Sequence, residues 1–160
     1  MRNNYTCGSG RFWGYNFQVE IRPARAGDID QVLAIERASF VDPWSRNGFA
    51  AELVRPGTLF WVIDDNGVIA GYIVVWDMVD YLYVANIAVE EARRGTGLGK
   101  ALIRRCVEYA VETGRRAIVL DVRVSNTRAR KFYEGLGFVK LRQNPGFYGK
   151  EDGITYVLRL

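Results

Sequence analysis

The sequence predicts a mixed α/β domain in which helices flank one central, mostly antiparallel sheet. Runs with the two-residue period of strands alternate with runs at the helical period, in the order β-α-α-β-β-β-α-β-α-β-β. The 160 residues are 49% hydrophobic and 25% charged, which is the balance of a chain that buries a sizeable core. No linker or internal repeat divides the chain, so we expect one domain over 18–160, preceded by an extension over 1–17.

The first expected strand covers 19–22, and the first helix begins at Asp28. Gln31, three residues after Asp28, has the spacing of a capping box. Glu36 falls on the apolar face of this helix, which predicts pairing with an arginine or, alternatively, a functional role. The apolar face itself is formed by Ile29, Val32, Leu33 and Phe40.

A short second helix and a hairpin are expected next. The helix covers 49–53 and is ended by Pro56. Two β-rich runs, 58–63 and 68–76, then flank the dipeptide Asn66-Gly67. This spacing predicts a tight β-hairpin, because an Asn-Gly pair readily adopts the left-handed conformation of its turn.

The most informative stretch joins a strand at 81–89 to a helix that begins after Gly97 and ends at Gly114. Two arginines and three glycines lie at the junction. The free N–H groups and the dipole of a helix start favour an anion, and glycine lets the backbone approach it closely. Neither a Walker loop nor a G-x-G-x-x-G fingerprint is present. The residues alone therefore leave two readings open, a diphosphate site and a basic turn exposed to solvent.

The last elements are a strand at 118–124, a helix and a final antiparallel pair at 138–141 and 154–158. Ser125 and Asn126 are expected to cap the helix. The apolar stripe of this helix is formed by Ala129, Phe132, Tyr133 and Leu136.

Composition excludes several classes of function. The chain has no histidine, which excludes Ser-His and Cys-His catalysis and histidine metal sites, so no metal site is predicted. Cys7 and Cys106 are too few for a disulfide scaffold, which favours a reducing cytoplasm. No apolar run is long enough to cross a membrane. The net charge of +4 suits an anionic cofactor, and the basic residues gather near the glycine-rich turn, so nucleic-acid binding is not expected.

The pattern R-x-x-G-x-G, formed by Arg94, Gly97 and Gly99 after the strand end N-I-A-V, resembles motif A of the GNAT superfamily of N-acetyltransferases. The resemblance covers about 19–160 and implies the GNAT fold, with acetyl-CoA as co-substrate. The cofactor-binding residues that it implies are Ile87, Ala88, Val89, Arg94, Gly95, Thr96, Gly97, Leu98, Gly99, Lys100 and Asn126.

Three further stretches resemble the RimI-type protein N-terminal acetyltransferases: A-S-F-V-D-P-W-S, L-D-V-R-V-S-N-T-R-A-R-K-F-Y-E-G-L-G-F and the loop F-Y-x-x-E-D. This resemblance implies acetyl transfer to the N-terminal α-amine of a protein, with a ribosomal protein as one target, by direct attack in a ternary complex. The alternative for Glu36 is then a role near this substrate amine. It makes Tyr133 the candidate acid and Asp121 the candidate base, where the family commonly has glutamate. It also implies substrate walls formed by Pro43, Trp44, Phe147 and Tyr148.

Alternatives remain for these residues and for the function. Tyr133 could be a core residue, and Asp121 could form an ion pair with Arg123 on the same strand face. Asn126 could be a helix cap as well as a cofactor contact. A covalent route through Cys106 is not expected. The rival functions are acetylation of a small-molecule amine or of a lysine side chain, and non-catalytic binding of acetyl-CoA. The sequence does not indicate the oligomeric state.

Overall fold

The computed structural model describes residues 19–160, so the expected extension over 1–17 lies outside the described residues. The elements are β1 (Val19–Pro23), η1 (Ala26–Asp28), α1 (Ile29–Ser39), α2 (Arg46–Val54), β2 (Thr58–Asp65), β3 (Val68–Asp77), β4 (Leu82–Val89), η2 (Glu91–Arg93), α3 (Leu98–Thr113), β5 (Ala117–Arg123), α4 (Thr127–Gly135), β6 (Val139–Asn144) and β7 (Gly153–Arg159). Their order confirms the predicted α/β class.

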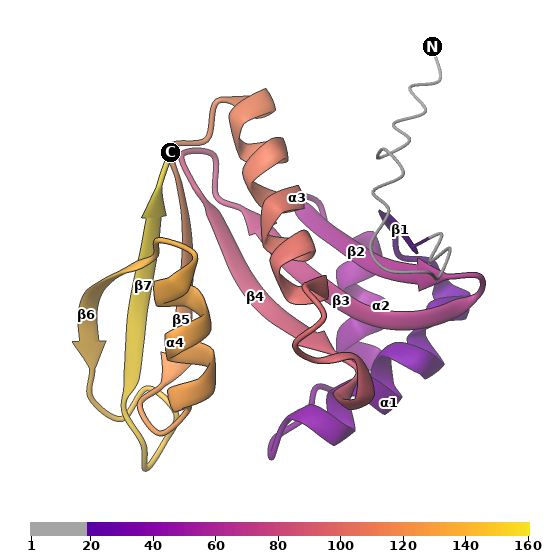
Figure 1. The fold of residues 1–160 in the computed structure, drawn as a ribbon, viewed down its shortest axis with the longest axis horizontal. Helices are drawn as coiled ribbons and strands as arrows, with labels where there is room; N and C mark the ends of the chain where they lie inside the picture. The colour runs from indigo at the N-terminus through magenta and orange to yellow at the C-terminus, as the bar shows by residue number, and fades with distance from the viewer. Residues whose placement is uncertain (1–18) are drawn as a thin grey trace.

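One seven-stranded sheet, in the order β1-β2-β3-β4-β5-β7-β6, runs through the molecule (Figure 1). Every neighbouring pair is antiparallel except β4 and β5. Apolar side chains of α3 and α4 pack on one face and those of α1 and α2 on the other, which gives two separate core clusters. The predicted sheet, flanked by helices and mostly antiparallel, is therefore confirmed.

The turn between β2 and β3 confirms the hairpin prediction. Asn66 and Gly67 both have positive φ, 54° and 89°, which is the left-handed geometry of a two-residue hairpin turn. The strands extend to Asp65 and Asp77, slightly beyond the predicted runs, because pairing continues after the apolar residues end.

The sheet opens between β4 and β5. Their parallel pairing is limited to Leu82–Val84 against Ile118–Leu120, after which the strands diverge (Figure 1). The register of β3 and β4 also shifts at this point, since Val74 pairs with Asn86 and Val75 with Val84, which leaves Ala85 as a bulge. The carboxyl-terminal half of β4 thus has one side without a strand partner. Both cavities described below lie at this opening.

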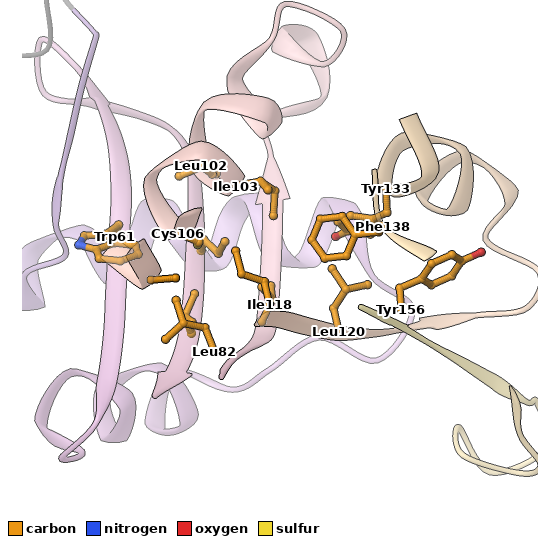
Figure 2. Packing of buried hydrophobic residues seen from close by; sticks show 14 of the residues in the cluster. Trp61, Leu82, Leu102, Ile103, Cys106, Ile118, Leu120, Tyr133, Phe138 and Tyr156 are labelled. Carbon is orange, nitrogen blue, oxygen red and sulfur yellow. The ribbon is translucent and has the colours of Figure 1, made fainter. Parts of the chain in front are cut away.

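The larger core cluster reaches the opening at α4. Figure 2 shows Tyr133 next to Phe138, at the end of a row of apolar side chains that includes Leu120 and Ile118. The rings of Tyr133 and Phe138 are 5.5 Å apart at an interplanar angle of 65°. The ring of Tyr133 is thus a core ring as well as a neighbour of the opening.

Two predictions about the first helix are wrong. Asp28 and Gln31 do not form a capping box: the Asp28 carboxylate accepts hydrogen bonds from Arg22, and the Gln31 amide donates to the Gly67 carbonyl in the β2–β3 turn and accepts from the Ile69 N–H in β3. Phe40 is not buried but 38% exposed, because α1 ends one residue before it.

The second helix is longer than predicted. It begins at Arg46 because Ser45 caps it, accepting a hydrogen bond from the Gly48 N–H at 3.1 Å. This cap also places Trp44, whose ring lies 5.4 Å from that of Phe49 and is partly buried against the second core cluster.

Candidate active site

A cavity of about 520 Å³ lies where β4, the glycine-rich turn and the first turns of α3 and α4 meet. Its lining combines apolar side chains from both sides of the opened sheet with glycines and basic residues. The lining residues are Ser39, Phe40, Ile87, Ala88, Val89, Arg93, Arg94, Gly95, Gly97, Gly99, Lys100, Asn126, Arg128, Ala129, Phe132 and Tyr133. We call it the donor cavity.

The glycine-rich turn forms an anion cradle at one end of the donor cavity. Gly95 and Gly97 have φ of 82° and 94°, and a Cβ at either position would meet no atom within 4 Å. The first intrahelical bond of α3 runs from the Ala101 N–H to the Gly97 carbonyl. The N–H groups of Leu98, Gly99 and Lys100, in the first turn of the helix, therefore have no partner within it. A phosphate fits this arrangement, because it would meet free N–H groups and the positive end of the helix dipole.

The basic side chains of the cradle have different roles. Arg94 lines the cavity, but its guanidinium donates to the Val89 carbonyl at 3.0 Å and to the Ser39 hydroxyl at 2.9 Å, so it orders the turn from within. Arg93 pairs with Asp65. Among the described residues, Lys100 and Arg128 line the cavity without an ion pair, so their charge is available to a ligand.

Two of the expected cofactor residues do not line the donor cavity with their side chains. The Thr96 hydroxyl donates to the Arg93 carbonyl at 2.7 Å and so stabilises the turn. Leu98 packs against the core cluster beneath α3. Any contact of Leu98 with a ligand would therefore run through its free backbone N–H.

The backbone of β4 offers hydrogen-bonding groups to the opening at alternate residues. The Glu90 N–H donates to the Ala70 carbonyl. Hydrogen-bonded pairs alternate along an antiparallel ladder, so the pair two residues earlier, Ala88 with Tyr72, is hydrogen-bonded as well. The N–H of Ala88 is thus used inside the sheet. Those of Ile87 and Val89 face away from β3, toward the opening.

A second cavity, of about 240 Å³, also has Tyr133 in its lining; we call it the acceptor cavity. It is lined by Glu36, Phe40, Asp42, Trp44, Val84, Ala85, Asn86, Ile87, Leu120, Asp121, Val122, Arg123, Asn126, Ala129, Tyr133 and Tyr148. The residues that line both cavities are Phe40, Ile87, Asn126, Ala129 and Tyr133. The two cavities therefore meet at one junction.

Tyr133 stands at this junction. It is only 6% exposed, and burial raises the pKa of its hydroxyl above the ordinary value of 10.0. No hydrogen-bond partner of the hydroxyl exists among residues 19–160. The ring of Tyr133 packs in the core, as the alternative held. The same residue nevertheless lines both cavities, and its hydroxyl keeps its proton at neutral pH.

Asp121 lies in the acceptor cavity and is held by three donors. The Tyr83 hydroxyl donates at 2.8 Å, the Thr155 hydroxyl at 2.5 Å and the Asn144 amide at 3.3 Å. Burial, and then the hydrogen bond to Asp121, raise the pKa of Tyr83. The alternative ion pair with Arg123 is wrong, because Arg123 turns to Asp42 and Glu151 instead.

Glu36 is a second carboxylate in the acceptor cavity and is 1% exposed. It accepts hydrogen bonds from the Trp44 N–H at 2.8 Å, from the Asn86 amide at 3.1 Å and from the Tyr72 hydroxyl. The predicted arginine partner is therefore wrong, since neutral donors satisfy this carboxylate. The expectation of a place near a substrate amine agrees with the position of Glu36 in the cavity lining.

The expected substrate walls are only partly in the lining. Trp44 and Tyr148 line the acceptor cavity, whereas Pro43 and Phe147 do not. The Phe147 ring lies 4.9 Å from the ring of Tyr148 in a T-shaped arrangement and is half exposed. Burial, and then the charge of Asp121, raise the pKa of Tyr148 to about 12.

The position of Asn126 allows both of the roles that the sequence suggested. Its side chain caps α4, accepting a hydrogen bond from the Ala129 N–H at 3.0 Å, which confirms the predicted cap. It also lines both cavities, so a cofactor contact is compatible with the cap.

Sequence reasoning missed several lining residues and also Tyr83, which lines neither cavity but donates to Asp121. Ser39 and Phe40 were not expected here, because the point at which α1 ends was not evident. Tyr83 was missed because only the pairing of β4 with β5 brings it to Asp121. Arg128 carried a usable signal, since it is the second residue of a helix that follows an N-cap beside the cavity.

Comparison with known proteins adds a family and relatives. The family model described as "Acetyltransferase (GNAT) family" matches residues 29–138. A Bacillus subtilis (strain 168) protein, provisionally named a ribosomal protein bS18-alanine N-acetyltransferase, is 39% identical over 121 residues, which are 75% of this chain and 80% of that protein. The Escherichia coli (strain K12) protein of that name is 31% identical over 135 residues, 82% of this chain and 90% of its own.

A solved structure agrees with these relatives. The crystal structure of the ribosomal-protein-S18-alanine N-acetyltransferase from Escherichia coli superimposes with a TM-score of 0.80 at 28% identity, over 88% of this chain and 93% of that one. In residues 19–160, no helix has both the length and the apolar character needed to cross a membrane.

Proposed function

The chain belongs to the GNAT acetyltransferase family, and from that premise we propose that it moves the acetyl group of acetyl-CoA to the N-terminal α-amine of a protein. Acetyl-CoA supplies the activated acyl group. The relatives named as alanine N-acetyltransferases of ribosomal protein bS18 support this acceptor class over a small amine. A ribosomal protein is therefore the first acceptor to test, and such an acceptor would place the reaction in the cytoplasm.

The observation that carries the proposal is the junction of the two cavities at Tyr133. The glycine cradle and the apolar walls of the donor cavity fit a diphosphate and its pantetheine arm. The acceptor cavity reaches the same junction and carries the Asp121 carboxylate in its lining. A donor and an amine can thus meet directly, which is what transfer within a ternary complex requires.

Tyr133 is proposed as the general acid. Its hydroxyl keeps the proton at neutral pH, because burial raises its pKa, and no described residue competes for that proton. It can donate to a leaving thiolate at the junction. The N–H groups of Ile87 and Val89, which face the opening, can stabilise negative charge that develops on the thioester oxygen.

Asp121 is proposed as the base that receives the proton of the amine, directly or through a water molecule. An N-terminal α-amine has a pKa of roughly 7.7–8.0, so part of it is already neutral at pH 7 and the base has modest work to do. The three donors on Asp121 fix the carboxylate at the cavity wall. Glu36 also lines the cavity, but it is 1% exposed and accepts hydrogen bonds from the Trp44 N–H and two side chains, whereas Asp121 is only partly buried.

The test compares three peptides of one sequence with an N-terminal alanine: one with a free N-terminus, one with a blocked N-terminus, and one blocked and carrying an internal lysine. Thiol release gives the rate, and mass spectrometry gives the acetylated position. We expect turnover of the free peptide alone. Equal turnover of the blocked lysine peptide, or turnover of small amines only, would overturn the proposed acceptor.

A further inference from the structure

Arg123, the last residue of β5, lies at the rim of the acceptor cavity and makes three contacts with its side chain. Its guanidinium pairs with Asp42 at 3.0 Å and with Glu151 at 3.4 Å. It also lies over the ring of Tyr148, 4.4 Å from the centroid. We call the set of Arg123, Asp42 and Glu151 the Arg123 bridge.

The Arg123 bridge connects two loops that are far apart in the sequence. Asp42 belongs to the loop between α1 and α2, which carries Trp44, and Glu151 belongs to the loop between β6 and β7, which carries Tyr148. Trp44 and Tyr148 are the two aromatic side chains by which these loops line the acceptor cavity. One side chain on a sheet strand is thus in contact with both walls.

We propose that Arg123 is a positioning residue for the acceptor: it holds the two loops at a fixed separation, so that an extended peptide enters between them with its amine toward Asp121. The identity of the acceptor rests on the proposed function. Position 123 is two residues after Asp121 on the same strand face. One strand therefore carries both the side chain that spaces the two walls and the carboxylate that the amine approaches.

Arginine suits this task better than lysine. A planar guanidinium can pair with two carboxylates while stacking on an aromatic ring, whereas an ammonium is a single point charge. Each contact alone is weak, because the side chain of Asp42 is 80% exposed and solvent screens it. The three together fix the loops through a side chain that is itself anchored at β5.

The fold does not depend on the Arg123 bridge. The side chain of Arg123 is 34% exposed and belongs to neither core cluster. Glu151 has a second anchor, since it accepts a hydrogen bond from the Ser125 N–H at 2.8 Å. Removing the guanidinium should therefore loosen the spacing of the loops without unfolding the domain.

The first measurement is steady-state kinetics of Arg123→Gln with the free alanine peptide. The KM for the peptide should rise roughly fivefold, while kcat and the KM for acetyl-CoA stay within about twofold. Arg123→Lys should recover only part of the loss. The matched control is Arg104→Gln, which removes the exposed ion pair between Arg104 and Glu108 on the outer face of α3. An equal rise of both KM values, or an unchanged peptide KM, would overturn the proposal.

The second measurement needs no acceptor and separates this proposal from the proposed function. Hydrogen exchange should become faster in Arg123→Gln but not in Arg104→Gln at two N–H groups: that of Trp44, which donates to the Glu36 carboxylate on α1, and that of Tyr148, which donates to the Glu151 carbonyl. Unchanged exchange in both loops would refute the bridge whatever the acceptor is. Faster exchange in an enzyme whose wild type turns over no peptide would support the bridge and refute the proposed acceptor.

Discussion

At the residue scale, the proposed chemistry depends on side chains that are buried yet keep one polar atom free to react. Tyr133 is the clearest case. Its ring contacts Phe132 and Phe138, with centroids at 5.1 and 5.5 Å, and these contacts fix the direction of the hydroxyl. The hydroxyl contributes no hydrogen bond to the described fold, so it can be removed with little loss of stability.

Tyr133→Phe should therefore separate catalysis from folding. We expect kcat to fall by about two orders of magnitude, the scale of a lost general acid. The melting temperature and the Kd for acetyl-CoA should stay close to those of the wild type, because the ring remains. Turnover assays give kcat, and calorimetry on the same samples gives the melting temperature and the Kd. Wild-type kcat under conditions where chemistry limits the rate would make Tyr133 a packing residue only.

Asp121→Asn should lower turnover near neutral pH and recover in part above about pH 8, where more of the α-amine is neutral without help from a base. Tyr83 and Thr155 donate to different oxygens of this carboxylate, so the NH2 group of the amide must face one of the two donors and cannot accept its hydrogen bond; some stability is lost as well. Tyr83→Phe is the control, since it removes one donor and keeps the carboxylate. A pH profile of Asp121→Asn parallel to that of the wild type would argue against a base at this position.

At the element scale, the decisive feature is the start of α3 next to the open side of β4. Gly97 is the N-cap residue and Gly114 the C-cap residue of the same helix, and both are left-handed, with φ of 94° and 74°. Only Gly97 lines the donor cavity. The two glycines therefore make a matched pair for testing the cradle.

Gly97→Ala and Gly114→Ala should each cost roughly 1 kcal/mol of unfolding free energy, because alanine is strained at positive φ. Only Gly97→Ala should also weaken acetyl-CoA binding, since its methyl group would take up space at the cradle, whereas that of Gly114→Ala would not. Denaturant unfolding and calorimetry on both variants test this. Equal affinity of the two variants for acetyl-CoA would contradict an anion site at the start of α3.

The order of elements could be predicted because its signals are local. The period of apolar residues, the Asn66-Gly67 turn and the glycines around α3 act over a few positions, and all of them correspond to elements in the structure. Helix ends were less certain. The end of α1 at Ser39 depends on contacts beyond the helix, among them the hydrogen bond from Arg94, which lies 55 residues away in the sequence.

The partners of the two carboxylates could not be predicted, because they depend on which strands become neighbours. Tyr83 lies 38 residues from Asp121, and Asn86 lies 50 residues from Glu36. Pairing rules within one strand or helix suggested arginines for both carboxylates. In the structure, strands β3, β4 and β7 bring neutral donors instead. The family resemblance named Asp121 and Tyr133, but not the network around them.

At the scale of the whole molecule, ion pairs join elements distant in the sequence and make stability depend on acid. Hydrogen bonds from Arg22 are the main cause that lowers the pKa of Asp28 and Asp64, and those from Arg115 lower the pKa of Asp77. Such carboxylates stabilise the fold above their unfolded pKa of about 3.9 and lose this contribution as the pH falls toward the folded values. Urea denaturation should show unfolding free energy dropping below about pH 4. Arg115→Gln should flatten that dependence, and an unchanged slope would contradict the assignment.

The arrangement of the whole molecule also decides between direct transfer and a covalent acetyl-enzyme. The one cysteine of the described residues, Cys106, has 0% exposure on the core side of α3, and burial raises its pKa to about 12. A thiol of this kind is not a nucleophile at neutral pH. The donor and acceptor cavities, in contrast, share five lining residues, among them Tyr133.

Direct transfer predicts intersecting double-reciprocal plots when peptide and acetyl-CoA are varied together, because both must be bound before either product leaves. Cys106→Ala should keep its turnover and lose about 1 kcal/mol of unfolding free energy, since it removes a packed sulfur atom from the core. Val111→Ala is the control, because its side chain is exposed on the same helix and its loss should leave both quantities unchanged. Parallel plots, together with loss of turnover in folded Cys106→Ala, would mean that the acetyl group passes through the thiol, and that the junction at Tyr133 is not where donor and amine meet.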